Sequence, residues 1–228
     1  MFNQKSILLV FIDRLGIQLY GGNLQSIISV QIPDSIVHDL EIVSRDSLYS
    51  LIKQWVKQYS IVGSQIVFIF SESMYVDKIF VISQQSQIET DILKYFELVP
   101  YESIWSKVFP AKNGKRAVAF NKALYEGIHQ GFLLQGLPTK CVIPAFALGE
   151  FETQHTLDLK MASYVLENLV ELSKLSLIDG QDSSIVYSSP PSAGATETDK
   201  KKSSLPMLLS IFGVLLLVLG VVAYIQFR

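Results

Sequence analysis

The chain has 228 residues, a formal net charge of −2 and one cysteine. This near balance of acidic and basic side chains disfavours a nucleic-acid-binding protein, which would carry a clear excess of basic residues. A single cysteine excludes an intramolecular disulfide and suits a reducing compartment. Cys141 lies in the apolar stretch KCVIPAFAL, and we interpret it as a small buried residue.

Strand and helix patterns alternate along the first half of the chain. Three β-prone runs separated by short turns predict an antiparallel meander, at 6–13, 16–22 and 24–33. Apolar residues at helical spacing predict two helices, at 44–61 and 86–98. Two apolar runs between these helices predict strands, at 63–73 and 75–82.

The second half of the chain continues this alternation. Two strand-like runs, 102–111 and 115–122, flank the dipeptide Asn113-Gly114, which is a strong hairpin signal. A helix that ends at Gly136, a strand and a long amphipathic helix are then predicted, at 123–137, 139–148 and 157–175. Because strands and helices interleave throughout, we expect an α/β domain built on a mixed sheet.

The last predicted helix carries one apolar face, formed by Leu159, Ala162, Leu166, Leu169, Val170 and Ser173. Packing against the domain core is the simpler interpretation of this face. Binding of a partner protein is the alternative.

The C-terminal segment differs in composition from the rest. Residues 182–204 are rich in Ser, Pro, Thr and Lys, which predicts a flexible linker. The run from Leu205 to Phe227 has no charged residue, and its roughly 23 residues are enough for a helix that crosses a bilayer. Three lysines precede the run, and positive charge stays on the cytoplasmic side; they are Lys200, Lys201 and Lys202. We therefore expect residues 1–181 to form the cytoplasmic domain of a tail-anchored, single-pass protein of the inner membrane.

Several turns, together with the element order, resemble a known family over roughly residues 6–149. They are the segment Tyr95-Phe96 followed by Leu98-Val99-Pro100-Tyr101-Glu102, then Gly136-Leu137-Pro138, and Ala145-Phe146-Ala147-Leu148. This pattern resembles the N-terminal half of PilM, the actin-like protein of type IV pilus assembly, and the cytoplasmic domain of the related type II secretion protein GspL.

The resemblance implies a mixed-sheet, actin-like (ribonuclease H-like) domain at the cytoplasmic face of the inner membrane. PilM-like proteins bind the cytoplasmic segment of a membrane partner and help to dock the motor ATPase of the assembly. Full-length members hold nucleotide between two lobes, and GspL-like members continue into a membrane span.

The first phosphate loop departs from the family pattern of Asp, an apolar residue, Gly and small hydroxyl residues. Here the segment reads Asp13-Arg14-Leu15-Gly16-Ile17, so the glycine is one position late and no Ser or Thr follows. In such folds the backbone N–H groups of a small-residue turn cradle phosphate. Arg14 is interpreted as a solvated turn residue, with a phosphate contact as the alternative.

The chain beyond Gly149 is too short for a second actin-like lobe. We therefore expect a truncated domain that carries no cofactor and has lost nucleotide hydrolysis.

Other candidate groups are weak. The three histidines, His38, His129 and His155, are far apart in the sequence and lack metal-ligand spacing. Each is interpreted as an ordinary surface or hydrogen-bonded histidine, and neither a metal site nor a catalytic residue is expected. The basic segment 112–116 is interpreted as a solubilising hairpin tip, with contact to an anionic membrane as the alternative.

Three functions remain open. The first is a membrane-anchored, non-enzymatic scaffold of a pilus or secretion assembly platform, with membrane proteins, the lipid bilayer and the motor ATPase as partners. The second is a divergent actin-like ATPase completed by oligomerisation or by a partner. The third is a tail-anchored binding module unrelated to pili, because similar α/β layouts serve unrelated functions.

Overall fold

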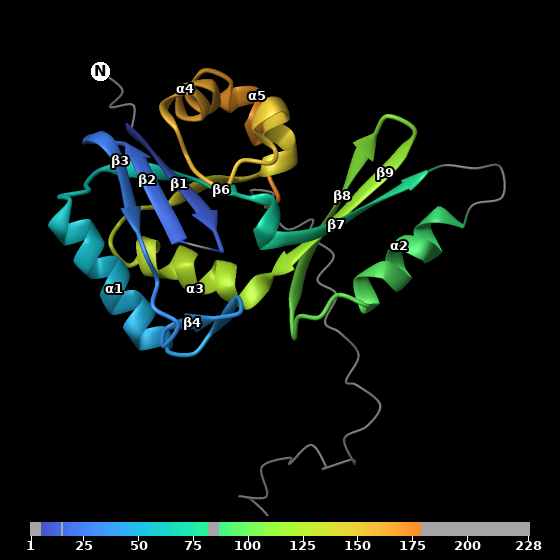
Figure 1. Cartoon of the computed structure of the whole chain (residues 1–228), viewed down its shortest axis with the longest axis horizontal. Helices are drawn as coiled ribbons and strands as arrows, with labels where there is room; N and C mark the ends of the chain where they lie inside the picture. The colour runs from blue at the N-terminus through green and yellow to red at the C-terminus, as the bar shows by residue number, and fades with distance from the viewer. Residues whose placement is uncertain (1–5, 15, 82–86, 179–228) are drawn as a thin grey trace, which may run out of the picture. The chain divides into compact units, whose positions relative to one another are not determined.

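A five-stranded mixed sheet lies at the centre of the fold in the computed structural model, which describes residues 6–14, 16–81 and 87–178 (Figure 1). The strand order is β10-β6-β1-β2-β3. These strands are β1 (Ser6–Asp13), β2 (Gly16–Gly21), β3 (Leu24–Val30), β6 (Ser64–Phe70) and β10 (Thr139–Pro144). β2 runs antiparallel to both β1 and β3, whereas β6 is parallel to β1 and to β10. The predicted meander and the predicted mixed sheet are therefore confirmed.

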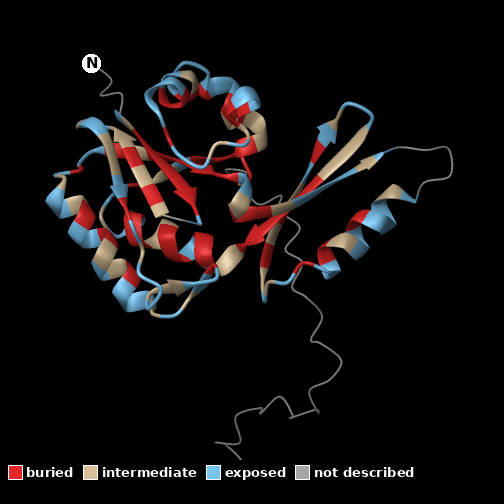
Figure 2. Ribbon diagram, viewed as in Figure 1, coloured by how far each residue is buried: buried red, intermediate tan, exposed pale blue. Residues whose placement is uncertain are grey.

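Helices cover both faces of this sheet. One face carries α1 (Arg45–Gln58) and α3 (Lys122–Leu133), and the other carries α4 (Leu159–Glu167) and α5 (Leu169–Ser173). Two-sided burial explains why β1 is an almost unbroken apolar run, since a central parallel strand has no solvent-exposed face. Figure 2 shows the central strands buried and the helices exposed on their outer faces.

A second, three-stranded antiparallel sheet has the order β7-β9-β8. It consists of β7 (Tyr75–Val81), β8 (Ile104–Ala111) and β9 (Gly114–Asn121), and α2 (Ile88–Glu97) packs on one of its faces. The short helices η1 (Glu72–Met74) and η2 (Ala145–Phe151) follow β6 and β10, and a small hairpin pairs β4 (Val37–His38) with β5 (Glu41–Ile42).

The predicted hairpin between β8 and β9 is confirmed. Ala111 pairs with Gly114, so Lys112 and Asn113 form a two-residue turn. A side chain at position 114 would collide with the carbonyl oxygen of Phe80 on the neighbouring strand β7. Glycine is therefore required there by the close approach of the third strand of the sheet.

The single long helix predicted over 157–175 is wrong, because the chain breaks at Asn168 between α4 and α5. The Asn168 side chain donates a hydrogen bond to the carbonyl oxygen of Tyr164 at 2.8 Å, a local bond of the kind that competes with helix continuation.

The apolar face predicted for this segment is correct only in part. Ala162 and Leu169 are buried, but Leu159 and Val170 are 58% and 73% exposed. The buried face instead comprises Met161, Ala162, Val165, Leu169 and Leu172.

The predicted linker and membrane span, including Lys200 to Lys202 and the run from Leu205 to Phe227, lie outside the described residues and stay predictions. Within the part of the chain that the structure describes, every helix is too short or too polar to cross a membrane.

Candidate functional site

The carboxylate of Asp13 lies at the end of β1, beside the end of the parallel strand β6. Ligands of open α/β sheets commonly bind at this edge. Asp13 is only 7% exposed. Its Oδ2 accepts hydrogen bonds from Ser71 Oγ at 2.6 Å and Ser73 Oγ at 3.0 Å, and it lies 3.0 Å from His155 Nδ1. The carboxylate is therefore held by groups from the connection that follows β6 and from the loop that follows η2.

His155 bridges two carboxylates. Its Nδ1 contacts Asp13, and its Nε2 lies 3.7 Å from Glu72 Oε1. The hydrogen bond and the negative charge of Asp13 raise the pKa of His155, so the imidazolium form is favoured. The interpretation of His155 as a surface or hydrogen-bonded histidine agrees with this contact, but it did not identify Asp13 as the partner. No sequence signal could have found it, because 142 positions separate the two residues.

The residues on both sides of the turn between β1 and β2 contact neighbouring elements. The backbone N–H of Arg14 donates to Ser73 Oγ at 3.2 Å. Gly16 has a φ of +151°, and a Cβ at this position would lie 2.8 Å from the carbonyl oxygen of Val30 on β3. The structure thus brings Asp13, Arg14 and Gly16 together at one turn, with the Arg14 N–H already used and Gly16 packed against a strand. Whether this turn binds nucleotide stays an untested prediction.

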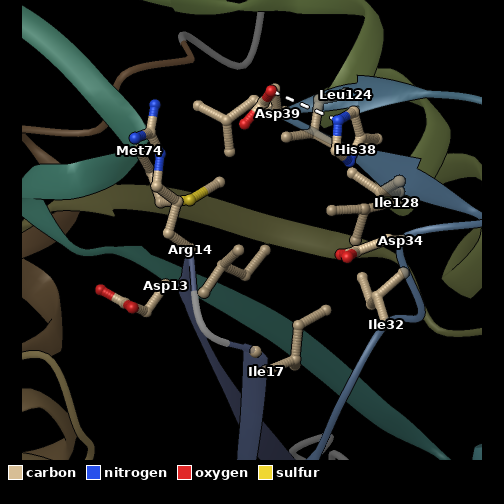
Figure 3. Close-up of a pocket in the computed structure, with 14 residues that line it drawn as sticks. Asp13, Arg14, Ile17, Ile32, Asp34, His38, Asp39, Met74, Leu124 and Ile128 are labelled. Carbon is tan, nitrogen blue, oxygen red and sulfur yellow. Dashed lines mark ion pairs between the residues drawn. The ribbon is translucent and has the colours of Figure 1, made fainter.

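A cavity of about 270 Å³ opens beside this turn (Figure 3). Arg14 and Asp13 lie on one side of it, and Asp34 and His38 lie on the other. The remaining lining is mainly apolar and comes from β1, β2, the 32–40 segment, η1 and α3: Ile12, Ile17, Ile32, Val37, Leu40, Met74, Leu124 and Ile128. The cavity therefore combines an apolar interior with a charged rim.

The rim turn Asp39-Leu40 is held in an unusual backbone conformation. Both residues have positive φ values, 47° and 65°, as a two-residue hairpin turn of type I′ requires. Asn121 donates from Nδ2 to the carbonyl oxygen of Leu40 at 2.9 Å, while its Oδ1 caps α3 by accepting from the Leu124 N–H at 3.1 Å. One buried amide thus fixes both the turn that carries Asp39 and the start of the helix that lines the cavity.

The charges of the rim select against phosphate. Three carboxylates, those of Asp13, Asp34 and Asp39, are present with one guanidinium and one imidazole. A phosphate would be repelled, whereas a cationic group next to an aliphatic chain would find both a charge partner and an apolar surface. Ligand pockets for drug-sized molecules begin at about 300 Å³, so this cavity of about 270 Å³ lies just below that range.

The remaining predicted site residues lie elsewhere. In the described ranges, no three side chains of the metal-ligating types are grouped closely enough to hold a metal ion. Cys141 is 2% exposed, as predicted, and burial raises the pKa of its thiol to about 11. At the basic hairpin tip, Lys115 pairs with Glu89, and Arg116 pairs with Asp77 and Glu152. These internal ion pairs disfavour the interpretation of the tip as a membrane contact.

No family model and no curated protein matches the sequence of this chain. Among solved structures, the fold is similar to the PilM-PilN type IV pilus biogenesis complex, with 14% identity, a TM-score of 0.44 and coverage of 63% of this chain and 48% of the other. It is also similar to the cytoplasmic domain of EpsL, an inner membrane component of the type II secretion system of Vibrio cholerae, with 13% identity, a TM-score of 0.37 and coverage of 63% and 58%.

A third similar structure is a protein of Bacteroides thetaiotaomicron with an actin-like ATPase fold and unknown function, with 11% identity, a TM-score of 0.37 and coverage of 64% and 56%. The first two structures come from the two systems whose proteins the sequence resembles, so that resemblance is confirmed. The chain spans about half of the length of these structures, and the likeness concerns the fold alone.

Proposed function

We propose that this protein is a membrane-anchored, non-enzymatic adaptor of a type IV pilus or type II secretion-like assembly platform. In this proposal the cavity beside Asp13 receives a short segment of a membrane partner at the cytoplasmic face. The observation that carries the proposal is the state of the Asp13 carboxylate, whose Oδ2 is engaged by two serine hydroxyls and an imidazole.

The Asp13 Oδ2 oxygen is poorly placed to act as a general base. A general base must be within hydrogen-bond reach of the proton that it removes, and the Asp13 oxygen that is already shared by three neighbours would first have to lose one of them. The closed turn argues in the same direction, because a phosphate cradle needs free backbone N–H groups, and that of Arg14 is bonded to Ser73.

The cavity favours a peptide that carries a basic group beside an apolar side chain. Binding of this kind buries a few side chains and is weak by itself. Confinement of both partners to one membrane would raise their effective concentration and compensate for the low affinity. The anchor predicted at 205–227 would provide that confinement.

A charge reversal at the rim tests this proposal. The tagged full-length chain is cross-linked in intact cells and purified, and the bound proteins are identified by mass spectrometry. We expect membrane proteins of a pilus or secretion platform with the wild-type chain, and their loss with Asp34→Lys. Glu167→Lys makes the same charge change on an exposed residue of α4, on the opposite face of the sheet, and should leave recovery unchanged.

Recovery of unrelated proteins alone would overturn the pilus or secretion assignment and favour the third alternative, a tail-anchored module of another system. Equal recovery with Asp34→Lys would instead show that partners bind away from the cavity.

The divergent ATPase remains the second candidate, and nucleotide binding separates the two. A ligand present at about 100 times its Kd adds roughly 2.7 kcal/mol to the free energy of unfolding. We expect no rise in the Tm of the full-length chain at millimolar Mg-ATP, and a clear rise would favour the ATPase.

A further inference from the structure

A second cavity lies at the end of the five-stranded sheet opposite Asp13, where β1, β6 and β10 begin. It is an open groove of about 710 Å³, within the range of roughly 300–1,000 Å³ that is typical of ligand pockets. Its lining comes from all five strands of the sheet and from the junction of α4 and α5. Among the described residues, it has no lining residue in common with the cavity beside Asp13.

The floor of this groove crosses the sheet from one outer strand to the other. Every strand contributes to it, in the order of the sheet: Lys140 from β10, Gln65 from β6, Ile7 from β1, Tyr20 from β2 and Leu24 from β3. Neighbouring strands lie about 4.8 Å apart, so the four steps from Lys140 to Leu24 span roughly 19 Å. One acyl chain spans half of a bilayer core that is about 30 Å thick. The groove is therefore long enough for a single acyl chain.

Apolar side chains form one wall of the groove. Leu166, Leu169 and Val170 come from the junction of α4 and α5. Leu166 and Val170 belong to the apolar face predicted from the sequence, but both are exposed at the groove instead of being buried in the core. Exposed apolar groups that gather beside a groove are typical of a binding site.

One charged side chain lines the groove, and it is basic. Lys140 is exposed, and its ammonium group has no ion pair or hydrogen bond with any other described residue. The described lining contains no acidic residue. A ligand with one negative group at the β10 end would therefore find a charge partner, while its hydrocarbon part would lie toward Tyr20 and Leu24.

The floor suits a hydrocarbon chain better than an extended peptide. An extended peptide binds a sheet by adding a strand at a free edge. Here β6, β1 and β2 are each paired on both sides, so the centre of the floor offers no free strand edge. A peptide backbone buried there would lack hydrogen-bond partners, a cost that a hydrocarbon chain does not have.

We infer that this groove binds a fatty acid, with the carboxylate paired to Lys140 and the single chain lying across the floor beside Leu166 and Val170. The inference rests on the groove alone and is independent of the cavity beside Asp13 and of the proposed partner.

Photoaffinity labelling tests the site in the purified full-length chain. The probe is an analogue of myristic acid that carries a diazirine in its chain, and mass spectrometry identifies the labelled peptides. We expect saturable label within residues 20–24 and 166–170, displaced by unmodified myristate. Label confined to the predicted span 205–227, or label that does not saturate, would overturn the inference, because it would report only non-specific partition.

A second probe and two lysine variants test the position of the carboxylate. The fatty alcohol with the same chain and diazirine lacks the charge, so the wild-type chain should bind it about threefold more weakly, as expected for an exposed ion pair. Lys140→Met should abolish this preference. Lys57→Met removes an exposed lysine from α1, on the other face of the sheet, and should keep it. An unchanged preference in the Lys140→Met chain would refute the pairing of the carboxylate with Lys140.

A charge placed in the apolar wall tests the position of the chain. Val170→Glu puts a carboxylate beside the bound hydrocarbon, and we expect labelling to fall roughly tenfold. Val43→Glu makes the same change at a valine that is 62% exposed beside the β4–β5 hairpin, and should leave labelling unchanged.

Two other occupants would give different results. Vesicles of dimyristoyl phosphatidylglycerol that compete as well as myristate, at equal chain concentration, would assign the groove to a membrane lipid and overturn the fatty acid. A co-purified protein that is lost with Val170→Glu, with no labelling of the wild-type chain, would assign the groove to a protein partner and overturn it as well.

Discussion

The end of β1 brings one buried carboxylate and one exposed imidazole into contact. Asp13 lies beneath His155, which also faces Glu72 from its other nitrogen. Two acidic neighbours favour the charged imidazole, and the pKa of His155 is raised mainly by the hydrogen bond to Asp13. This contact ties the loop after η2 to the turn that borders the cavity, so its strength should follow the protonation of His155.

The stability of the chain should therefore depend on pH through His155. Because its pKa in the folded chain lies above the ordinary value of 6.5, its contribution is fully present below about pH 6.5 and is lost as the pH rises through the raised value. We expect His155→Gln to lower the free energy of unfolding at about pH 6 and to have a smaller effect at about pH 9.

Urea unfolding of both chains at both pH values gives the comparison. An equal effect of His155→Gln at the two pH values would contradict the ion-pair account.

Sequence alone located only part of this site. Asp13 and Gly16 could be singled out because the segment resembles the first phosphate loop of the actin-like family. Ser71, Ser73 and His155 could not, since their contacts with Asp13 form only when β6 pairs in parallel with β1 and η2 folds back across the sheet. Asp34 and Asp39 belong to the 32–40 segment, whose position beside the turn has no local signature.

At the scale of elements, local patterns predicted most strands and turns. They missed the β4–β5 hairpin, extended the strand predicted at 139–148 into η2, and missed the break at Asn168. The β8–β9 hairpin carries its signal in Asn113-Gly114, although the turn itself is Lys112-Asn113 and Gly114 is the first residue of β9. The break at Asn168 has a weaker signature, since apolar spacing continues on both sides and only the bond from the Asn168 side chain to Tyr164 marks the end of α4. The apolar spacing typical of a helix continues through Asn168, but the helix itself ends there.

Gly114 and Gly136 are needed for different reasons, the first for lack of space and the second for its backbone conformation. Gly114 has a neighbouring carbonyl, that of Phe80, where a Cβ would stand, and Gly136 has free space but a φ of +78°. We expect Gly136→Ala to cost about 1 kcal/mol, the usual penalty of the left-handed conformation. Gly114→Ala should cost about 3 kcal/mol, because β7 must move away from β9.

Thermal unfolding of the two single variants and the wild type measures this difference. A smaller loss for Gly114→Ala than for Gly136→Ala would show that β7 moves easily to accommodate a side chain at position 114.

At the scale of the whole described region, the two sheets are joined through η2. Phe146 packs edge-on against Phe109 of β8, with ring centroids 5.0 Å apart, and beneath the guanidinium of Arg116 at 4.3 Å. Arg116 Nε donates to Asp77 Oδ2 at 2.6 Å, and its Nη2 donates to Glu152 Oε1 at 2.8 Å. Individual strands and hairpins were predictable from local sequence, but the division into two sheets and this junction depend on residues far apart in the chain and could only be seen in the fold.

Arg116 should therefore contribute more to stability than an ordinary surface ion pair. Its side chain is only 19% exposed and makes charge-assisted hydrogen bonds in two directions. We expect Arg116→Met to lower the free energy of unfolding by about 2 kcal/mol, because both carboxylates then lose a partner while the packing against Phe146 is largely kept. Lys174→Met removes the exposed ion pair with Glu171 and should change the free energy of unfolding by less than about 0.5 kcal/mol.

A double-mutant cycle measures the part of this stabilisation that comes from the bond between Arg116 on β9 and Glu152 at the end of η2. If the bond to Glu152 holds the junction, Arg116→Met and Glu152→Gln should be coupled by about 1 kcal/mol, and the double variant should be little worse than Arg116→Met alone. Hydrogen exchange should also quicken in residues 145–158 of the Arg116→Met chain, because η2 loses its tie to β9. Additive losses with unchanged exchange would mean that apolar packing around Phe146 is sufficient to join the sheets. Arg116 would then lie beside the junction without stabilising it.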